Sequence, residues 1–113
     1  MPHIIIEHSQ SAIALPERQG LVDELYQVVE SAGLFKSENI KVRLHPLEYF
    51  KLGLPDSEFI HVMCRIHVGK TDEQKQWLTQ AVLNAISERI EGRCVITVEV
   101  VEMARGSYAK MIL

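Results

Sequence analysis

Cysteine is scarce in this 113-residue chain, and so are excess charge and long apolar runs. The two cysteines, Cys64 and Cys94, form no C-x-x-C pattern, which favours a reduced, cytoplasmic protein. The net charge is −3 and there is no basic block, which argues against a nucleic-acid partner. No apolar run reaches the length of a membrane span, and no basic-then-apolar leader precedes the first apolar run. We therefore expect neither a membrane partner nor a secretory signal.

Motifs for metal, nucleotide and nucleophile chemistry are missing as well. His61 and His67 are too far apart along one strand to share a metal ion, and no Cys or Glu completes a zinc spacing. The stretch around Lys70 is not a P-loop, because Cys64 stands where that motif needs glycine. Cys64 itself falls in an apolar alternation and is better interpreted as core packing than as a nucleophile. We expect no cofactor and no metal.

The chain does contain an apolar pattern of strand, helix and strand that occurs twice. Hydrophobic residues make up 47% of the sequence, so we expect one domain over 1–113 with a modest core. Thr71 and Gln74 have the capping-box spacing at the start of a helix, and Pro46 is expected to end a strand. Periodicity predicts strands at Ile4–Ile6, Ile40–His45, Phe59–Val68 and Val95–Met103, and helices at 16–32 and from Thr71 to near Gly92.

These elements form two strand–helix–strand halves, which predicts an α+β fold. Two such units with right-handed crossovers place both helices on one face of a four-stranded sheet. The other face stays uncovered, although it carries Phe59 and Met63. A half-apolar open face on a small domain is best explained by burial against other copies, so we expect a homo-oligomer. The tail over 104–113 is expected to be a closing hairpin or an arm onto a neighbour.

Pro2 stands at the entrance of the first strand, followed by His3-Ile4-Ile5-Ile6-Glu7. An initiator Met is usually trimmed before a small residue, and trimming would give Pro2 a free secondary amine. Burial and nearby cations both disfavour the ammonium form of such an amine. Pro2 is therefore a candidate general base near neutral pH. The alternative is that a chain beginning with Met-Pro is common and has no functional meaning.

Cationic side chains form the second candidate site. Lys41, Arg43 and His45 alternate onto one strand face, where an anion would relieve their mutual repulsion. Lys70 lies at a strand-to-helix turn that favours anions. Each has an alternative interpretation as a solvated residue. Tyr108 in the tail is a candidate lid over a site or an anchor to the core.

The residues resemble those of the tautomerase superfamily, and within it the 5-carboxymethyl-2-hydroxymuconate delta-isomerases. The resemblance rests on Pro2 opening the first strand, on the 41–45 motif, and on Phe59-Ile60-His61-Val62 followed by Gly69-Lys70-Thr71 and a helix. It runs from Pro2 to about Lys110. That family tends to carry Arg where Lys41 and Lys70 stand here.

The resemblance implies a homotrimer with active sites near subunit boundaries, acting in the breakdown of aromatic compounds. It implies that Pro2 moves a proton between carbons of an unsaturated 2-hydroxy or 2-keto dicarboxylate. Arg43 would hold a carboxylate or polarise the keto oxygen, with Lys41, Lys70 and Tyr108 binding the substrate. Two alternatives remain: a hydratase of the same superfamily, in which a charged Pro2 acts as an acid, and a trimeric binding protein without catalysis.

Overall fold

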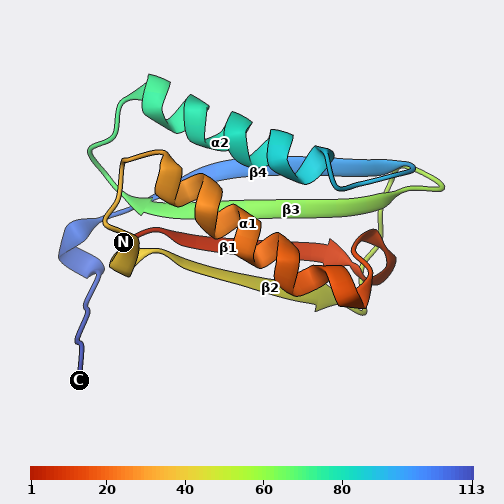
Figure 1. Ribbon diagram of the computed structural model, residues 1–113, viewed down its shortest axis with the longest axis horizontal. Coiled ribbons are helices and arrows are strands. Elements are labelled where there is room, and N and C mark those ends of the chain that lie inside the picture. Colours follow the sequence, from red (N-terminus) through yellow and green to blue (C-terminus); the bar gives the residue numbers. More distant parts are fainter.

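Four strands and two long helices make up the fold in the computed structural model, which describes residues 1–113 (Figure 1). The sheet has the order β2-β1-β3-β4. Neither helix combines the length and apolar character needed to cross a membrane. In chain order the elements are β1 (His3–Ser9), α1 (Arg18–Ser31), β2 (Lys41–Leu47), β3 (Glu58–His67), α2 (Asp72–Ser87) and β4 (Cys94–Met103).

The predicted duplication and fold class are confirmed. β1 pairs with β2 in parallel across α1, and β3 pairs with β4 in parallel across α2. The two halves meet where β1 pairs antiparallel with β3, with Ile5 opposite Met63. Parallel neighbours need a crossover connection, and each helix supplies one. The result is a mixed four-stranded sheet made of two equivalent units.

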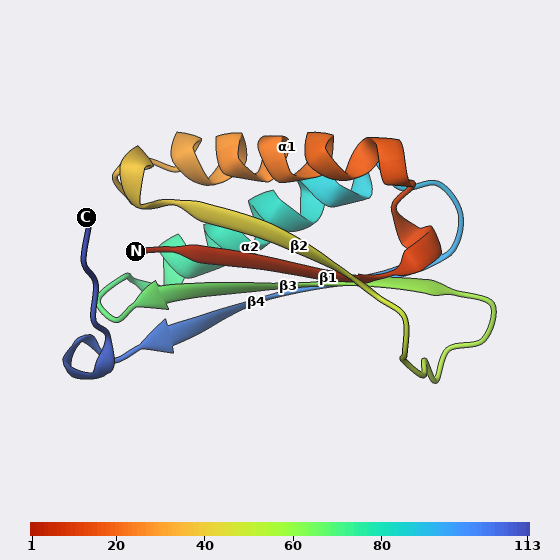
Figure 2. The ribbon, with the colours of Figure 1, turned by 90° about the horizontal axis from the view of Figure 1, so that it is seen from below.

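The core lies between the sheet and the two helices, which both cover the same face (Figure 2). Alternate residues of β1 and β3 point into it, because successive side chains of a strand face opposite ways. Its fully buried members include Ile4, Ile6, Ile60, Val62 and Cys64 from the sheet, and Leu21, Leu25, Val29, Leu78, Val82 and Ile86 from the helices.

The opposite face of the sheet is covered by no other element of the chain (Figure 2). His3, Ile5 and Glu7 of β1 alternate with the buried residues and lie on this open face. Their register partners Lys41, Arg43 and His45 on β2 lie beside them and are exposed. The expected uncovered face is therefore confirmed, with aliphatic and charged side chains mixed on it.

Three boundaries differ from the predictions. β2 continues through Pro46 to Leu47, because β2 is an edge strand and one row of its N–H groups needs no partner. A 3₁₀ turn over Leu15–Glu17 holds Pro16, so α1 starts at Arg18 rather than at 16. The tail forms no hairpin: a 3₁₀ turn over Arg105–Ser107 leads into an irregular end.

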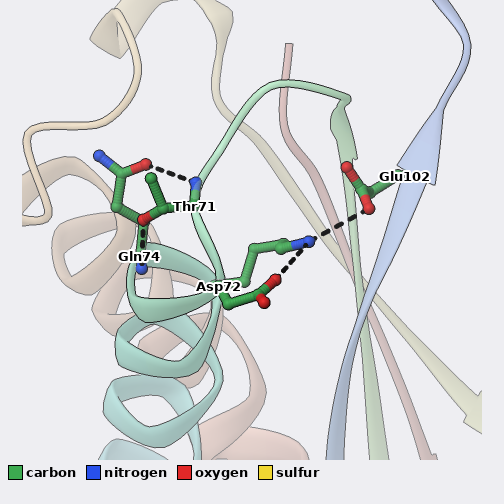
Figure 3. Close-up of polar contacts among 5 residues, drawn as sticks. Thr71, Asp72, Gln74 and Glu102 are labelled. Atoms are coloured by element: carbon green, nitrogen blue, oxygen red, sulfur yellow. Dashed lines mark hydrogen bonds and ion pairs between the residues drawn. The ribbon is translucent and has the colours of Figure 1, made fainter.

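The start of α2 carries the predicted capping box (Figure 3). The Thr71 hydroxyl accepts a hydrogen bond from the Gln74 backbone N–H at 3.2 Å, and the Gln74 side chain accepts from the Thr71 N–H at 2.9 Å. Lys75 adds ion pairs to Asp72 and to Glu102 of β4. These contacts fix the turn between β3 and α2, which carries Lys70.

Candidate active site

One end of the molecule gathers four segments that are far apart in the sequence (Figure 1). They are the amino terminus, the loop before β2, the turn between β3 and α2, and the tail after β4. Two cavities open here, of about 330 Å³ and 490 Å³, and Met1 lines both. The first is lined also by Phe35, Lys70 and Arg105, and the second by Lys41, Tyr108 and Lys110.

Pro2 lies directly behind Met1 and is itself buried. Its carbonyl accepts a hydrogen bond from the Lys41 backbone N–H at 3.1 Å, which ties the start of the chain to the start of β2. The Lys41 ammonium lies 3.8 Å from the Met1 sulfur. Pro2 is therefore held in place at the start of β1, and the Lys41 ammonium lies beside Met1, the residue before it.

Positive charge surrounds the chain's amino group. Burial lowers the pKa of the Met1 amino group, and so do the charges of Lys110, Lys41, Arg105 and Lys70, in that order. All four cations act in the same direction, because an ammonium among ammonium and guanidinium groups is repelled. This end of the molecule therefore favours a neutral amine and would attract anions.

The cations are held in place by neighbouring side chains. The Lys70 Nζ lies 5.5 Å from the centre of the Phe35 ring, within the range of a cation–π contact. The Lys110 Nζ donates a hydrogen bond to the Asn39 Oδ1 at 2.9 Å, which links the tail to the loop before β2. Gly69 adopts φ 122, a backbone conformation that favours glycine and turns the chain toward Lys70.

Tyr108 is bound to the first strand through His3. The His3 Nε2 lies 2.8 Å from the Tyr108 hydroxyl, and the His3 Nδ1 lies 3.1 Å from the Arg43 Nη1. His67 packs edge-on against the Tyr108 ring, with 4.8 Å between the ring centres. Burial, the terminal amine and Arg105 lower the pKa of His67. The tyrosine ring thus sits between two histidines at the rim of the larger cavity.

The structure brings together four of the residues singled out in the sequence. Lys41 and Tyr108 line the larger cavity with Met1, and Lys70 lines the smaller one, with Pro2 behind. Arg43 is not among the residues lining either cavity, nor among the charges that lower the pKa of the amino group. It lies on the open face and reaches this end only through His3.

Sequence reasoning missed Arg105, Lys110, His67 and His3 as members of this site. Arg105 and Lys110 flank Tyr108 in the sequence, and two cations around a candidate lid were a usable signal. His67 and His3 gave no signal of this kind, because their neighbours come from other segments. Cys64 is excluded as a nucleophile: burial raises the pKa of its thiol to about 12.

Comparisons with known proteins identify the family and the fold. The family model of 5-carboxymethyl-2-hydroxymuconate isomerase matches residues 2–109. Among solved structures, a 5-carboxymethyl-2-hydroxymuconate isomerase from Deinococcus radiodurans R1 superposes with a TM-score of 0.81 at 21% identity, covering 97% of this chain and 88% of that one. The wild-type W0 fused 4-OT symmetric trimer superposes with a TM-score of 0.80 at 13% identity, covering 96% of this chain and 93% of that one.

A 5-carboxymethyl-2-hydroxymuconate delta-isomerase structure gives a TM-score of 0.73 at 17% identity, covering 98% of this chain and 88% of that one. At these identities the likeness to solved structures establishes the fold. The curated proteins give no match to the sequence.

Proposed function

Because the chain belongs to the 5-carboxymethyl-2-hydroxymuconate isomerase family and is therefore an isomerase, we propose that Pro2 is its general base and acid. Removal of Met1 frees the proline nitrogen for this role. The substrate is an unsaturated 2-hydroxy or 2-keto dicarboxylate, and no cofactor takes part. The observation that carries the proposal is the burial of Pro2 next to Met1, whose amino group has its pKa lowered by the four cations Lys110, Lys41, Arg105 and Lys70.

The same cations serve both the base and the reaction intermediate. A neutral proline amine takes a proton from the substrate, which leaves a dienolate with its charge spread onto oxygen. The resulting ammonium returns that proton to a different carbon, so the composition of the substrate is unchanged. Fixed positive charge stabilises the dienolate as it develops and also favours the neutral amine between turnovers.

Substrate carboxylates are assigned to the side chains that line the two cavities. Lys41 and Tyr108 bind one end of the diacid, and Lys70 binds the other. Arg43 uses one N–H on His3 and has further donors for a carboxylate or a keto oxygen. Since Met1 lines both cavities, its loss would join them around the nitrogen of Pro2.

A homotrimer completes the proposal. The uncovered sheet face carries Ile5 and Met63 side by side, and burial against two other copies would remove them from water. One fold relative is a symmetric trimer. Arg43 lies exposed on this face, so a neighbouring copy would approach it.

The reaction belongs to the breakdown of aromatic compounds.

Lowered basicity favours isomerisation over the hydratase alternative. Hydration needs a proline that stays charged and acts as an acid. Burial and the surrounding cations lower the pKa of the Met1 amino group, and the same cations would act on the Pro2 amine after Met1 is removed. Titration of the Pro2 amine by NMR separates the two reactions. A pKa well above neutrality would support the hydratase.

The test is a Pro2→Ala variant assayed for ketonisation of a 2-hydroxymuconate by absorbance. Alanine leaves a primary amine on a freely rotating residue, so we expect kcat/KM to fall roughly a hundred-fold or more, the scale of general acid–base catalysis. Pro55→Ala, in the exposed loop before β3, is the matched control and should keep full activity.

Intact-mass measurement accompanies the assay, because retained Met1 would leave no free proline amine. An unchanged rate in Pro2→Ala would remove the proline from the mechanism.

A further inference from the structure

We propose that His3 is a positioning residue: Arg43 holds it in a single neutral tautomer, and His3 in turn makes Tyr108 a hydrogen-bond donor to an anionic oxygen of the bound ligand. The inference rests on the proposed function for the identity of that ligand, a dicarboxylate or its dienolate. It gives Arg43 a role that acts through His3, in addition to any contact with substrate.

The tautomer follows from which groups are able to donate. Arg43 Nη1 lies 3.1 Å from His3 Nδ1. A guanidinium carries only N–H donors and has no acceptor, so His3 Nδ1 must accept this hydrogen bond. A neutral imidazole with an unprotonated Nδ1 carries its hydrogen on Nε2. Arg43 therefore selects the Nε2–H form of His3.

The direction of the next hydrogen bond follows from the first. His3 Nε2–H donates to the Tyr108 hydroxyl oxygen over 2.8 Å. The hydroxyl's own hydrogen is then unused, because Tyr108 makes no other side-chain hydrogen bond in the chain. A hydroxyl that accepts a hydrogen bond is polarised into a stronger donor. Tyr108 lines the cavity that it shares with Met1, Lys41 and Lys110, so that hydrogen is available to a ligand there.

Charge around His3 keeps the ring neutral. Burial lowers the pKa of His3, and so do Arg43 and Lys41 on β2, the terminal amine, and Arg65 on β3. Protonation of His3 would place a second N–H against the Arg43 guanidinium, which has no lone pair to accept it. The Tyr108 ring is fixed meanwhile by edge contacts with His67 and with His3 itself.

The ligand atom that Tyr108 addresses is an anionic oxygen. Lys41 and Lys110 line the same cavity as the hydroxyl, so an oxygen there would meet two ammonium groups and one O–H donor. A carboxylate or an enolate oxygen accepts hydrogen bonds from all three, whereas an ammonium group has no lone pair and accepts none. Tyr108 thus selects for acidic ligands at this end of the cavity.

The tautomer can be tested without any activity measurement. In protein labelled with 15N-histidine, long-range 1H–15N spectra distinguish Nδ1–H, Nε2–H and imidazolium forms, and the His3→Gln variant assigns the signal. We expect His3 to be neutral and Nε2–H only at pH 7. Arg43→Leu should let the Nδ1–H form of His3 appear.

An Nδ1–H form or an imidazolium at His3 in the unmodified protein would overturn the inference, whatever the enzyme catalyses. If Pro2→Ala leaves the rate unchanged while His3 shows the expected form, the proposed function fails and the tautomer assignment stands.

Kinetics test the link from His3 to Tyr108. Tyr108→Phe removes one hydrogen bond to a charged oxygen, so we expect kcat/KM to fall roughly ten-fold to a hundred-fold. His3→Leu should lower kcat/KM by a similar factor. The double variant with His3→Leu and Tyr108→Phe should have a kcat/KM only slightly below that of Tyr108→Phe alone. His3→Gln keeps an N–H near the Nε2 position and should recover part of the loss. Losses that multiply in the double variant would show that His3 does not act through the hydroxyl.

Discussion

Lys110 is the charged residue that most lowers the pKa of the Met1 amino group, and it comes from the tail. We propose that the same charge acts on the Pro2 amine once Met1 is removed, so Lys110→Met should raise the pKa of that amine. A base that is active when neutral then needs a higher pH, and the acid limb of kcat/KM should move upward. The pH profile of the ketonisation rate measures this shift.

Lys51→Met is the control for this prediction. It removes the same charge from the exposed loop between β2 and β3, at the opposite end of the molecule (Figure 1). An acid limb that stays in place in Lys110→Met, or moves equally in Lys51→Met, would contradict the role given to the tail.

Single residues differ in how far the sequence could place them. Pro2 and Lys41 lie at the starts of the two strands of one predicted strand–helix–strand unit. Because a helix crossover makes these strands parallel, the predicted unit was enough to bring both residues to one end. Lys110 could not be placed, because its position depends on a hydrogen bond to Asn39 across the fold. The role of His3 depends on two partners, Arg43 and Tyr108, that no local pattern connects to it.

At the scale of elements, the capping box of α2 is the feature with the clearest energetic consequence. Thr71→Ala leaves the Gln74 N–H without its partner, and we expect the free energy of unfolding to fall by about 1 kcal/mol. Urea denaturation followed by circular dichroism measures this loss. Thr79→Ala, within the same helix, is the control and should change stability less. Equal losses in the two variants would contradict the capping role.

Elements were predicted well where a local signal marks their ends. Thr71 and Gln74 identify the start of α2, and Gly33, with φ 70, follows the end of α1. β2 was predicted too short, because a proline permitted at a sheet edge cannot be recognised before the strand order is known. The tail has no repeating pattern at all, and its path is set by contacts with His3, Asn39 and His67.

At the scale of the whole molecule, the uncovered sheet face determines the expected assembly. Met63 lies opposite Ile5 near the middle of this face. Met63→Asp would place a carboxylate where we propose that copies meet, so trimers should dissociate while the helices are retained. Sedimentation velocity measures the change in mass. Gln76→Asp, exposed on α2 away from the open face, should leave the mass unaltered.

A chain that sediments as a monomer before any substitution would contradict the trimer.

Both ends of the chain lie at the same end of the molecule, beside the two cavities (Figure 1). This has a practical consequence for producing the enzyme. An affinity tag fused ahead of Pro2 would turn its nitrogen into an amide, and a single residue left after tag cleavage would do the same. If Pro2 is the general base that we propose, such a preparation would fold and yet show no activity, and its lack of activity would say nothing about the protein with a free Pro2 amine.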